Sequence, residues 1–373
     1  MEIEGQGLAQ RYRLFECIQC GRCTSGCPMS LKTDLNIRRL LYEALLNEEM
    51  EVQGKGVLWD CTTCLTCSFR CPKGLEPAEM IIGLRGLLVE GGQIPPTVRD
   101  ALKSLSIRGN PLTMAKNERA NWAQGLGVKD IAQGAEVLYY VGCIPSYDPR
   151  VQKVAKALVR AFQEGRVDFG ILGNEEICCG SEARRVGESG LFEMLRELNG
   201  EILASLPIKR LVTTSPHCYN VFKKEYPGFD FEVQHYTQFI SGLLEEGRLT
   251  FSKGVDKVVT YQDPCFLGKQ NKVFQEPRRI LQSIPGLKLV EMERSRERSL
   301  CCEGGGGRMW VEGTNPKERL AHLRIREALE VGAQILATAC PFCLLTLEDA
   351  AKTVAGEEGL QVRDIMELVA EAL

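Results

Sequence analysis

The chain has 373 residues, with 46 basic and 49 acidic side chains and a formal net charge of −3 at pH 7. This length exceeds one typical domain and predicts two or three units, each able to bury its own core. The balanced charge argues against nucleic acid or an anionic membrane as the main partner and favours other proteins.

The 17 cysteines are far more than a chain of this size ordinarily carries. In a secreted protein they would form a disulfide framework. The first residues lack the basic-then-apolar pattern of a signal peptide, and apolar runs such as residues 84–89 are too short to span a bilayer. We therefore expect a cytoplasmic protein without a membrane span, which reaches a membrane only through a partner and whose thiols bind metal.

Residues 1–92 contain eight cysteines and a stretch at 35–46 whose apolar residues recur at helical spacing, which predicts a small, mostly helical unit. The cysteines form two copies of C-x2-C-x2-C-x3-C-P. In two-cluster bacterial ferredoxins, three cysteines of such a run bind one [4Fe-4S] cubane and the fourth binds the other. Two ligand sets are expected: Cys17, Cys20, Cys23 and Cys71 for one cluster, and Cys61, Cys64, Cys67 and Cys27 for its neighbour.

Zinc is the alternative to clusters in this unit, because C-x2-C pairs also bind zinc tetrahedrally. Zinc sites typically use two separated pairs, whereas here three cysteines follow at tight spacing and a fourth precedes proline. The spacing favours two cubanes, which transfer single electrons. It does not give the direction of electron flow.

Residues 93–134 contain no cysteine. Pro-Pro and Gly-Asn-Pro sequences interrupt its polar helical patches. We interpret this segment as a connector that packs on the rest of the chain.

From residue 136 onward the chain repeats itself at a spacing of about 120 residues. In each copy a β-rich run leads to a cysteine, a Cys-Cys pair follows, and a second β-rich run leads to the last cysteines. The first copy contains Cys143, Cys178, Cys179 and Cys218, and the second contains Cys265, Cys301, Cys302, Cys340 and Cys343. A repeat of this length indicates two related units.

Within each copy, short β-rich runs alternate with helical stretches such as 151–163 and 316–330, and each copy continues with a further strand and helix, at 231–236 and 237–246 or at 361–364 and 365–373. This alternation predicts βαβ units and parallel sheets. Because ligands collect at the carboxyl ends of parallel strands, the scattered cysteines of one copy are expected to converge. The predicted fold class is an α+β multidomain protein, with a ferredoxin-like domain at 1–92, the connector at 93–134, and two α/β lobes at 135–250 and 251–373.

The repeated pattern of one cysteine, a Cys-Cys pair and C-x2-C resembles the double cysteine-rich, or CCG, domain of heterodisulfide reductases. Over about residues 10–373 the chain is similar to the ferredoxin-like subunit of that reductase fused to its CCG subunit. Similar fused proteins accompany glycolate and glycerol-3-phosphate dehydrogenases and acyl-CoA dehydrogenase systems. The resemblance implies that a complete CCG motif binds a non-cubane [4Fe-4S] cluster, and that the partners are a flavoprotein or other redox subunits.

Carried over to this sequence, the resemblance gives a complete set of five cysteines in the second copy and implies a non-cubane cluster there. Glu303 stands where the motif has glycine, but Gly304 follows at once. In the first copy Ser215 replaces one cysteine. The four remaining cysteines match the number that a cubane takes. A cluster with Ser215 as an oxygen ligand, or no cluster, are the alternatives.

The function implied is an iron–sulfur electron-transfer subunit of a heterodisulfide-reductase-like oxidoreductase complex, with catalysis only within that complex and a disulfide as the candidate substrate. The alternative is a non-catalytic subunit of a flavin-dependent hydroxy-acid, glycerol-phosphate or acyl-CoA dehydrogenase system linked to quinone or an electron-transfer flavoprotein. Ser215 favours the alternative. His217, beside Cys218, is a candidate proton carrier or a packing residue, and Lys269 and Arg308 are candidates for tuning a cluster.

Overall fold

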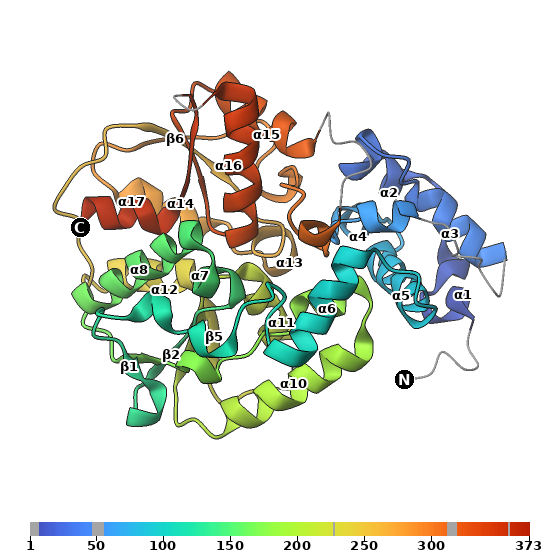
Figure 1. Cartoon of the computed structure of the whole chain (residues 1–373). Helices are drawn as coiled ribbons and strands as arrows, with labels where there is room; N and C mark the ends of the chain where they lie inside the picture. Colours follow the sequence, from blue (N-terminus) through green and yellow to red (C-terminus); the bar gives the residue numbers. More distant parts are fainter. Residues whose placement is uncertain (1–6, 47–55, 227, 312–318, 357–358) are drawn as a thin grey trace.

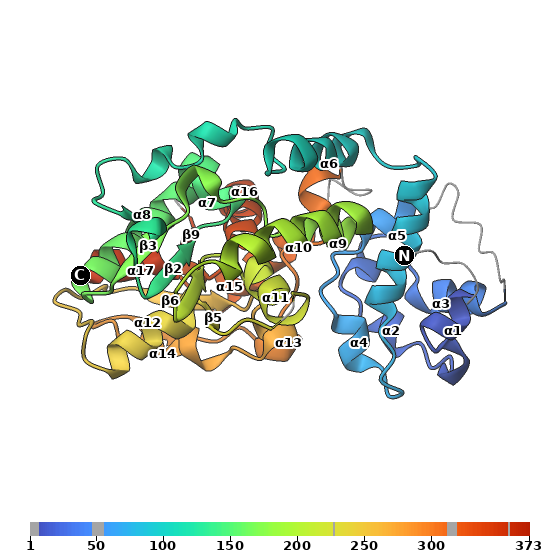
Figure 2. The same cartoon turned by 90° about the horizontal axis from the view of Figure 1, so that it is seen from below.

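In the computed structural model the described residues are 7–46, 56–226, 228–311, 319–356 and 359–373. The N-terminal helices α1 to α5 form one end of the molecule and the two sheets form the other, in both views (Figures 1 and 2). The predicted mixture of helices and parallel sheets is confirmed. Among the described helices, none combines the length and the apolar content that crossing a bilayer requires.

The N-terminal unit is helical. Its helices are α1 (Leu8–Arg11), α2 (Arg22–Ser25), α3 (Ile37–Leu46), α4 (Thr66–Arg70) and α5 (Pro77–Glu90). In α3 the apolar residues Ile37, Leu40, Leu41 and Ala44 are buried, as the helical spacing in 35–46 predicts. Pro77 begins α5, where its missing N–H costs no helical hydrogen bond.

The segment predicted as a connector contains helix α6 (Pro96–Arg108), which ends at Gly109 in the left-handed conformation. Figure 2 shows α6 running along the molecule between the N-terminal helices and the lobes. Strand β1 (Lys129–Asp130) also belongs to this segment and pairs with β3 of the first sheet. The segment therefore packs closely on the rest of the chain.

The first lobe has a five-stranded parallel sheet in the order β1-β3-β2-β4-β5. Its further strands are β2 (Val137–Tyr140), β3 (Phe169–Ile171), β4 (Arg210–Thr213) and β5 (Glu232–His235). Its helices are α7 (Cys143–Tyr147), α8 (Pro149–Glu164), α9 (Ser181–Val186), α10 (Ser189–Ala204), α11 (Pro216–Lys224) and α12 (Tyr236–Glu245). Every residue of β2 is buried, as expected for a parallel sheet covered on both faces.

The second lobe has a four-stranded parallel sheet in the order β7-β6-β8-β9. Its strands are β6 (Val258–Gln262), β7 (Lys288–Val290), β8 (Ile335–Thr338) and β9 (Gln361–Asp364). Its helices are α13 (Gly268–Asn271), α14 (Gln275–Ser283), α15 (Leu320–Glu330), α16 (Pro341–Ala355) and α17 (Ile365–Ala372). The helix predicted at 316–330 is α15, and residues 316–318 lie outside the described residues. The order β7-β6-β8-β9 repeats β3-β2-β4-β5, which confirms the internal repeat.

The two lobes share one hydrophobic core that contains residues of both sheets. Helix α17 packs against α8, and α14 packs against α12. Arg150 at the start of α8 donates hydrogen bonds to Glu348 and Glu367 of the second lobe. Across the same interface the Tyr236 hydroxyl donates to Asp364. The lobes are therefore fixed relative to each other by apolar packing and by paired polar groups.

The N-terminal unit is joined to the lobes through Arg85 of α5, which is fully buried. Its guanidinium donates to the backbone oxygens of Leu58 and Cys61 in its own unit, of Arg185 in the first lobe and of Gly306 in the second. One side chain thus satisfies carbonyl groups from all three parts of the molecule. Because its guanidinium is buried and hydrogen-bonded to several backbone oxygens, Arg85 is held in one orientation.

Candidate iron–sulfur sites

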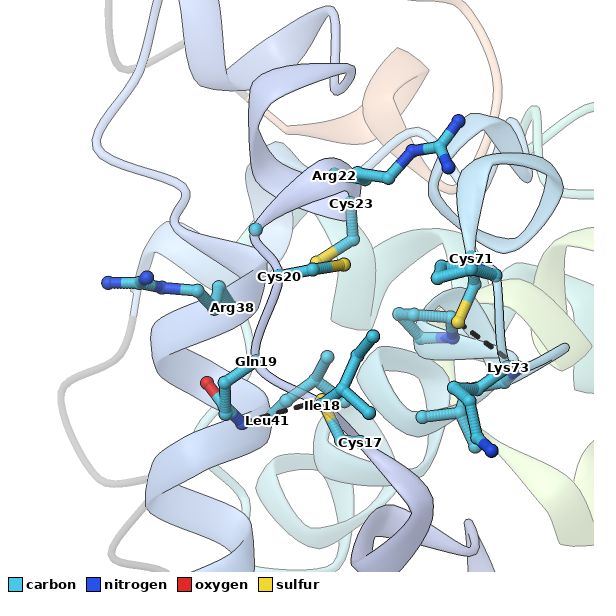
Figure 3. A pocket seen from close by; sticks show the side chains of 14 residues that line it. Cys17, Ile18, Gln19, Cys20, Arg22, Cys23, Arg38, Leu41, Cys71 and Lys73 are labelled. Carbon is cyan, nitrogen blue, oxygen red and sulfur yellow. Dashed lines mark hydrogen bonds between the residues drawn. The ribbon is translucent and has the colours of Figure 1, made fainter.

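The predicted outer ferredoxin set, Cys17, Cys20, Cys23 and Cys71, lines a single cavity at the end of the molecule away from the lobes. Figure 3 shows the four thiols facing a common space, with Cys71 reaching it from the second run. Cys20 is exposed and Cys17 and Cys71 are partly exposed. The spacing predicts that Cys71 of the second run joins three cysteines of the first run. The structure places these four side chains around one cavity.

The predicted inner ferredoxin set is Cys61, Cys64, Cys67 and Cys27, and all four are buried. Their thiols interact electrostatically with one another. Burial raises the pKa of Cys27 to about 11 and that of Cys61 to about 12. Buried thiols of this kind become thiolates only with a compensating positive partner, which iron supplies.

Both ferredoxin runs have the same backbone conformation. Gln19 and Thr63, which precede the second cysteine of each run, and Gly21 and Leu65, which follow it, all have positive φ. Three of these four are not glycine and carry the strain of the left-handed region. The turn at Thr63 directs its N–H to the Cys61 Sγ at 3.4 Å, which is the kind of hydrogen bond that tunes a cluster's potential.

In the first lobe the predicted set Cys143, Cys178, Cys179 and Cys218 lines one cavity. Cys143 follows β2, the Cys178–Cys179 pair follows β3, and Cys218 follows β4. The Sγ atoms of Cys179 and Cys218 are 3.2 Å apart, and the Cys143 and Cys178 thiols are hydrogen-bonded. The convergence at the carboxyl ends of parallel strands that the sequence predicts is observed here.

Ser215, which replaces a cysteine of the repeat, is the N-cap of α11. Its Oγ accepts a hydrogen bond from the His217 N–H at 3.3 Å. In the second lobe Cys340 is the N-cap of α16, and it makes no such side-chain hydrogen bond. Ser215 and Cys340 therefore occupy equivalent positions. The serine hydroxyl accepts a hydrogen bond from one of the free N–H groups of its helix, so the first lobe has no fifth thiol at this position.

In the second lobe the five predicted cysteines, Cys265, Cys301, Cys302, Cys340 and Cys343, are all buried. The Sγ atoms of Cys302 and Cys343 are 3.0 Å apart. Cys301 interacts with Cys265 and Cys302, and Cys340 interacts with Cys343. The lobe thus brings together one thiol more than the first lobe.

Glu303 has the left-handed conformation, with φ of 69°, at the position where the first lobe has Gly180 with φ of 81°. Each residue donates its N–H to the first sulfur of the preceding Cys-Cys pair, at 3.4 Å to Cys301 and 3.5 Å to Cys178. The replacement of glycine by glutamate therefore keeps the turn and its hydrogen bond. It adds the strain of a side chain in this conformation.

The inner ferredoxin set and the second-lobe set meet directly. The Cys64 thiol interacts with the Cys301 thiol, and this interaction and burial both raise the pKa of Cys64 above its ordinary value. The Cys301 Sγ also lies 3.4 Å from the Thr62 hydroxyl. At the same contact, Gly306 is so close to the backbone of Thr62 that an added Cβ would lie 2.6 Å from its carbonyl carbon. The glycine run therefore allows the close approach of these two sets.

Lys269 lies at the same contact and is buried. Its Nζ donates to the Thr66 Oγ1 at 2.9 Å and to the backbone oxygen of Ser299 at 2.7 Å, so that it bridges the two units. Its positive charge lowers the pKa of Cys64, against the larger effects of the Cys301 thiol and burial. Arg308 instead pairs with Asp60 at 3.2 Å.

The connector brings Arg119 to the first-lobe set, where it is buried with Glu176. The Arg119 Nη2 lies 2.7 Å from the Glu176 Oε1 and 3.5 Å from the Cys143 Sγ. Glu176 in turn accepts the N–H groups of Val141 and Gly142, just before Cys143. Sequence analysis did not identify this pair, because the arginine lies in a segment without cysteines and the glutamate has no motif around it.

His217 lies between the two lobe sites. Its ring stacks on Phe266 with centroids 4.0 Å apart and lies 4.6 Å from that of Phe342, both from the second lobe. Burial lowers the pKa of His217 to about 4, so the ring is neutral near pH 7. Its Nδ1 is 3.6 Å from the Glu182 Oε1, and both residues line the first-lobe cavity. His217 therefore packs between the two lobes.

His235 lies away from these cavities. It ends β5 and caps α12, and its ring contacts the Thr237 hydroxyl at 2.8 Å and the Thr214 carbonyl oxygen at 3.1 Å. Among the side chains that the structure describes, no group of three or more His, Cys, Asp or Glu is arranged to hold a single metal ion.

Comparison with known proteins gives two domain matches. Residues 13–75 match the 4Fe-4S dicluster domain. Residues 137–223 and 259–348 each match the cysteine-rich domain CCG. The matched ranges contain both ferredoxin runs and both copies of the repeat.

Three similar proteins cover nearly all of the chain. The "Probable iron-sulfur-binding oxidoreductase FadF" of Bacillus subtilis is 33% identical over 100% of the chain and 61% of its own length. The "EtfAB:quinone oxidoreductase" of Syntrophomonas wolfei is 32% identical over 100% of the chain and 60% of its own length. One subunit of the "Dihydromethanophenazine:CoB--CoM heterodisulfide reductase" of Methanosarcina barkeri is 32% identical over 98% of the chain and 95% of its own length. The chain thus spans about three fifths of the first two proteins and nearly all of the third.

Proposed function

The chain belongs to the family that joins a 4Fe-4S dicluster domain to two cysteine-rich CCG domains and that includes a subunit of heterodisulfide reductase, and on this premise we propose that it is an iron–sulfur electron-transfer subunit of a heterodisulfide-reductase-like complex. Iron–sulfur clusters supply one-electron transfer when bound. The cysteines of this chain would hold them, and every cysteine outside the outer set is buried.

The observation that carries this proposal is the contact between the inner ferredoxin set and the second-lobe set, where the Cys301 Sγ lies 3.4 Å from the Thr62 hydroxyl and Gly306 packs on the Thr62 backbone. The outer ferredoxin set is the one with an exposed cysteine, Cys20. The sites therefore follow one another from the surface, through the inner ferredoxin set, to the second lobe. Two ferredoxin-type sites in this arrangement lead to a buried site.

The cysteine sets fit the groups that we assign to them. Each ferredoxin set offers four thiols, which suits a cubane. In the first lobe the four thiols together with the capping role of Ser215 support a conventional [4Fe-4S] cluster held by Cys143, Cys178, Cys179 and Cys218. In the second lobe the five buried thiols support a non-cubane cluster.

The experiment that tests the proposal mixes the reduced, cluster-loaded protein with a mixed disulfide of two small thiols, under anaerobic conditions. Reduction of one disulfide takes two electrons and two protons and gives two thiols. Reoxidation of the wild type, and none in the Cys301→Ala variant, would support disulfide reduction at the second-lobe site. If the disulfide does not reoxidise the wild type but a one-electron acceptor protein does, the chain is an electron relay and does not reduce disulfides.

The relay is the second candidate function: a non-catalytic subunit that passes electrons between a flavin-dependent dehydrogenase system and quinone or an electron-transfer flavoprotein. Ser215 favours it, because the two lobes do not offer matched five-thiol sites. The similarity to an EtfAB:quinone oxidoreductase over the whole chain supports it as well. Rapid reduction of the loaded protein by a reduced electron-transfer flavoprotein, without reaction with the disulfide, is the result expected of this candidate.

A further inference from the structure

Basic side chains surround the outer ferredoxin set on the surface of the molecule. Of the 14 residues that line its cavity, three are cationic, namely Arg22, Arg38 and Lys73, and none is an aspartate or a glutamate. In Figure 3 the charged ends of these three side chains point away from the thiols. All three are exposed. Three positive charges and no carboxylate therefore line the cavity that contains the exposed Cys20.

These cations are free to bind an outside group. Within the described part of the chain, none of the three forms an ion pair. The nearby carboxylate of Glu16, whose pKa Lys73 helps to lower, is already paired with Arg13 at 2.7 Å. An ion pair with a partner would thus replace no internal contact.

An exposed apolar side chain lines the same cavity as the three cations. Ile18 follows the first cysteine of the set and is 62% exposed. Apolar side chains next to charges are typical of protein interfaces, where the apolar groups are desolvated and the charges guide the encounter.

We propose that this basic face, made of Arg22, Arg38, Lys73 and Ile18, is the docking surface for a redox protein that presents an acidic face around its own one-electron cofactor. This inference rests on the proposed electron-transfer function. In the docked complex one electron passes between the partner and the outer site, and no bond forms or breaks. The opposite charges raise the association rate.

An anionic lipid surface would also attract these cations. The redox partner is favoured because the three cations line the cavity of a predicted redox site, and a membrane surface has no electron to exchange there. The two occupants give different results in the test below.

The test measures by stopped flow how fast a reduced acidic flavodoxin reduces the loaded protein at low ionic strength. The wild type is compared with the triple variant Arg22→Glu, Arg38→Glu, Lys73→Glu. The matched control is Lys156→Glu, an exposed lysine on α8 at the other end of the molecule. We expect the second-order rate constant to fall about tenfold or more in the triple variant and to be unchanged in the control. The difference should shrink as salt is added, because salt screens the charges.

Two further probes make the result specific. Excess dithionite should reduce the wild type and the triple variant to the same final extent, which shows that the clusters are intact. A basic cytochrome c should oxidise the reduced triple variant faster than the reduced wild type, because the sign of the face is reversed.

Equal rates with flavodoxin for the wild type and the triple variant, with clusters intact, would overturn the docking surface and leave the proposed function standing. If the triple variant no longer binds anionic vesicles but is reduced by flavodoxin at the wild-type rate, the face binds lipid and the docking surface is likewise overturned. A wild type that contains no reducible cluster would overturn the proposed function, and the docking surface with it.

Discussion

The most informative single residue of the first lobe is Arg119, which reaches the Cys143 sulfur from outside the lobe's own cysteine motif. Its buried guanidinium is held by Glu176 so that one N–H points at the sulfur. Hydrogen bonds to the sulfurs and positive charge nearby raise the reduction potential of an iron–sulfur cluster. The first-lobe site therefore has a guanidinium in contact with one of its sulfurs, and it has one thiol fewer than the second-lobe site.

Arg119→Lys keeps the charge beside Glu176 but loses the planar fork that serves both partners. We expect the midpoint potential of the first-lobe cluster to fall, measured by redox titration followed by EPR. Arg278→Lys is the control, since Arg278 is a buried arginine of the second lobe that binds Asp263 and Glu291. An unchanged first-lobe potential in Arg119→Lys would show that the arginine only supports the fold.

Ser215 can be tested by restoring the cysteine of the repeat. Ser215→Cys gives the first lobe the five thiols that the second lobe has, at the position equivalent to Cys340. We expect a second non-cubane EPR signal, at a cost in stability of about 1 kcal/mol from the lost cap. The same signal pattern as in the wild type would mean that position 215 lies outside the reach of the cluster.

His235 predicts a pH dependence of stability. Burial lowers its pKa to about 3, whereas the unfolded chain titrates near 6.5. Below about pH 6.5 His235 binds a proton in the unfolded state but not in the folded state, so the free energy of unfolding falls as the pH falls. His235 lowers the free energy of unfolding by about 1.4 kcal/mol per pH unit in this range.

His235→Asn retains a side chain that can cap α12 and removes the titrating group. Denaturant unfolding of the variant between pH 7 and pH 5 should therefore show a weaker pH dependence than the wild type. Parallel curves for the two proteins would contradict this assignment.

The residue scale also shows where sequence reasoning ends. The ferredoxin cysteines could be assigned to sets from the spacing of the two runs, and the lobe cysteines from the internal repeat and its resemblance to the CCG domain. The structure brings the side chains of each set together. Arg119 could not be assigned, because its partner Glu176 lies 57 residues away along the chain and neither residue belongs to a motif.

Among the elements, the turns after the two Cys-Cys pairs hold the cysteines in place, because each turn donates an N–H to a cysteine sulfur. Gly180 has positive φ, and an added Cβ would lie 2.9 Å from Phe192. Gly180→Ala should therefore lower the free energy of unfolding by more than about 1 kcal/mol and loosen the first-lobe cluster. Gly200→Ala on the open face of α10, where a Cβ meets nothing within 4 Å, should raise it by up to about 1 kcal/mol. Equal effects on chemical unfolding would show that the turn is not constrained.

The elements that sequence reasoning identified are those with a strong pattern. β9 (Gln361–Asp364) has the predicted bounds, and α12 and α17 differ from them by one residue. The strands β3 and β7 were not predicted, because each has three residues and too few to show a period. The cysteine pairs that follow them are nevertheless placed at the carboxyl ends of strands.

At the scale of the whole molecule, the order of the parts along the chain could be read from the motifs, but their contacts could not. The inner ferredoxin set meets the second lobe, although the first lobe follows sooner in the sequence. This contact depends on Arg85, which joins carbonyl oxygens of three parts, and on the close approach of Gly306 to Thr62. Such long-range packing has no local signature.

We infer that both lobes hold clusters and that the ferredoxin-type sites lead to them. Iron and acid-labile sulfide analysis of the anaerobically purified protein tests this inference. Four four-iron clusters give about sixteen irons for each chain. A value of about eight would mean that the ferredoxin-type sites alone are filled, and would contradict the account of the two lobes.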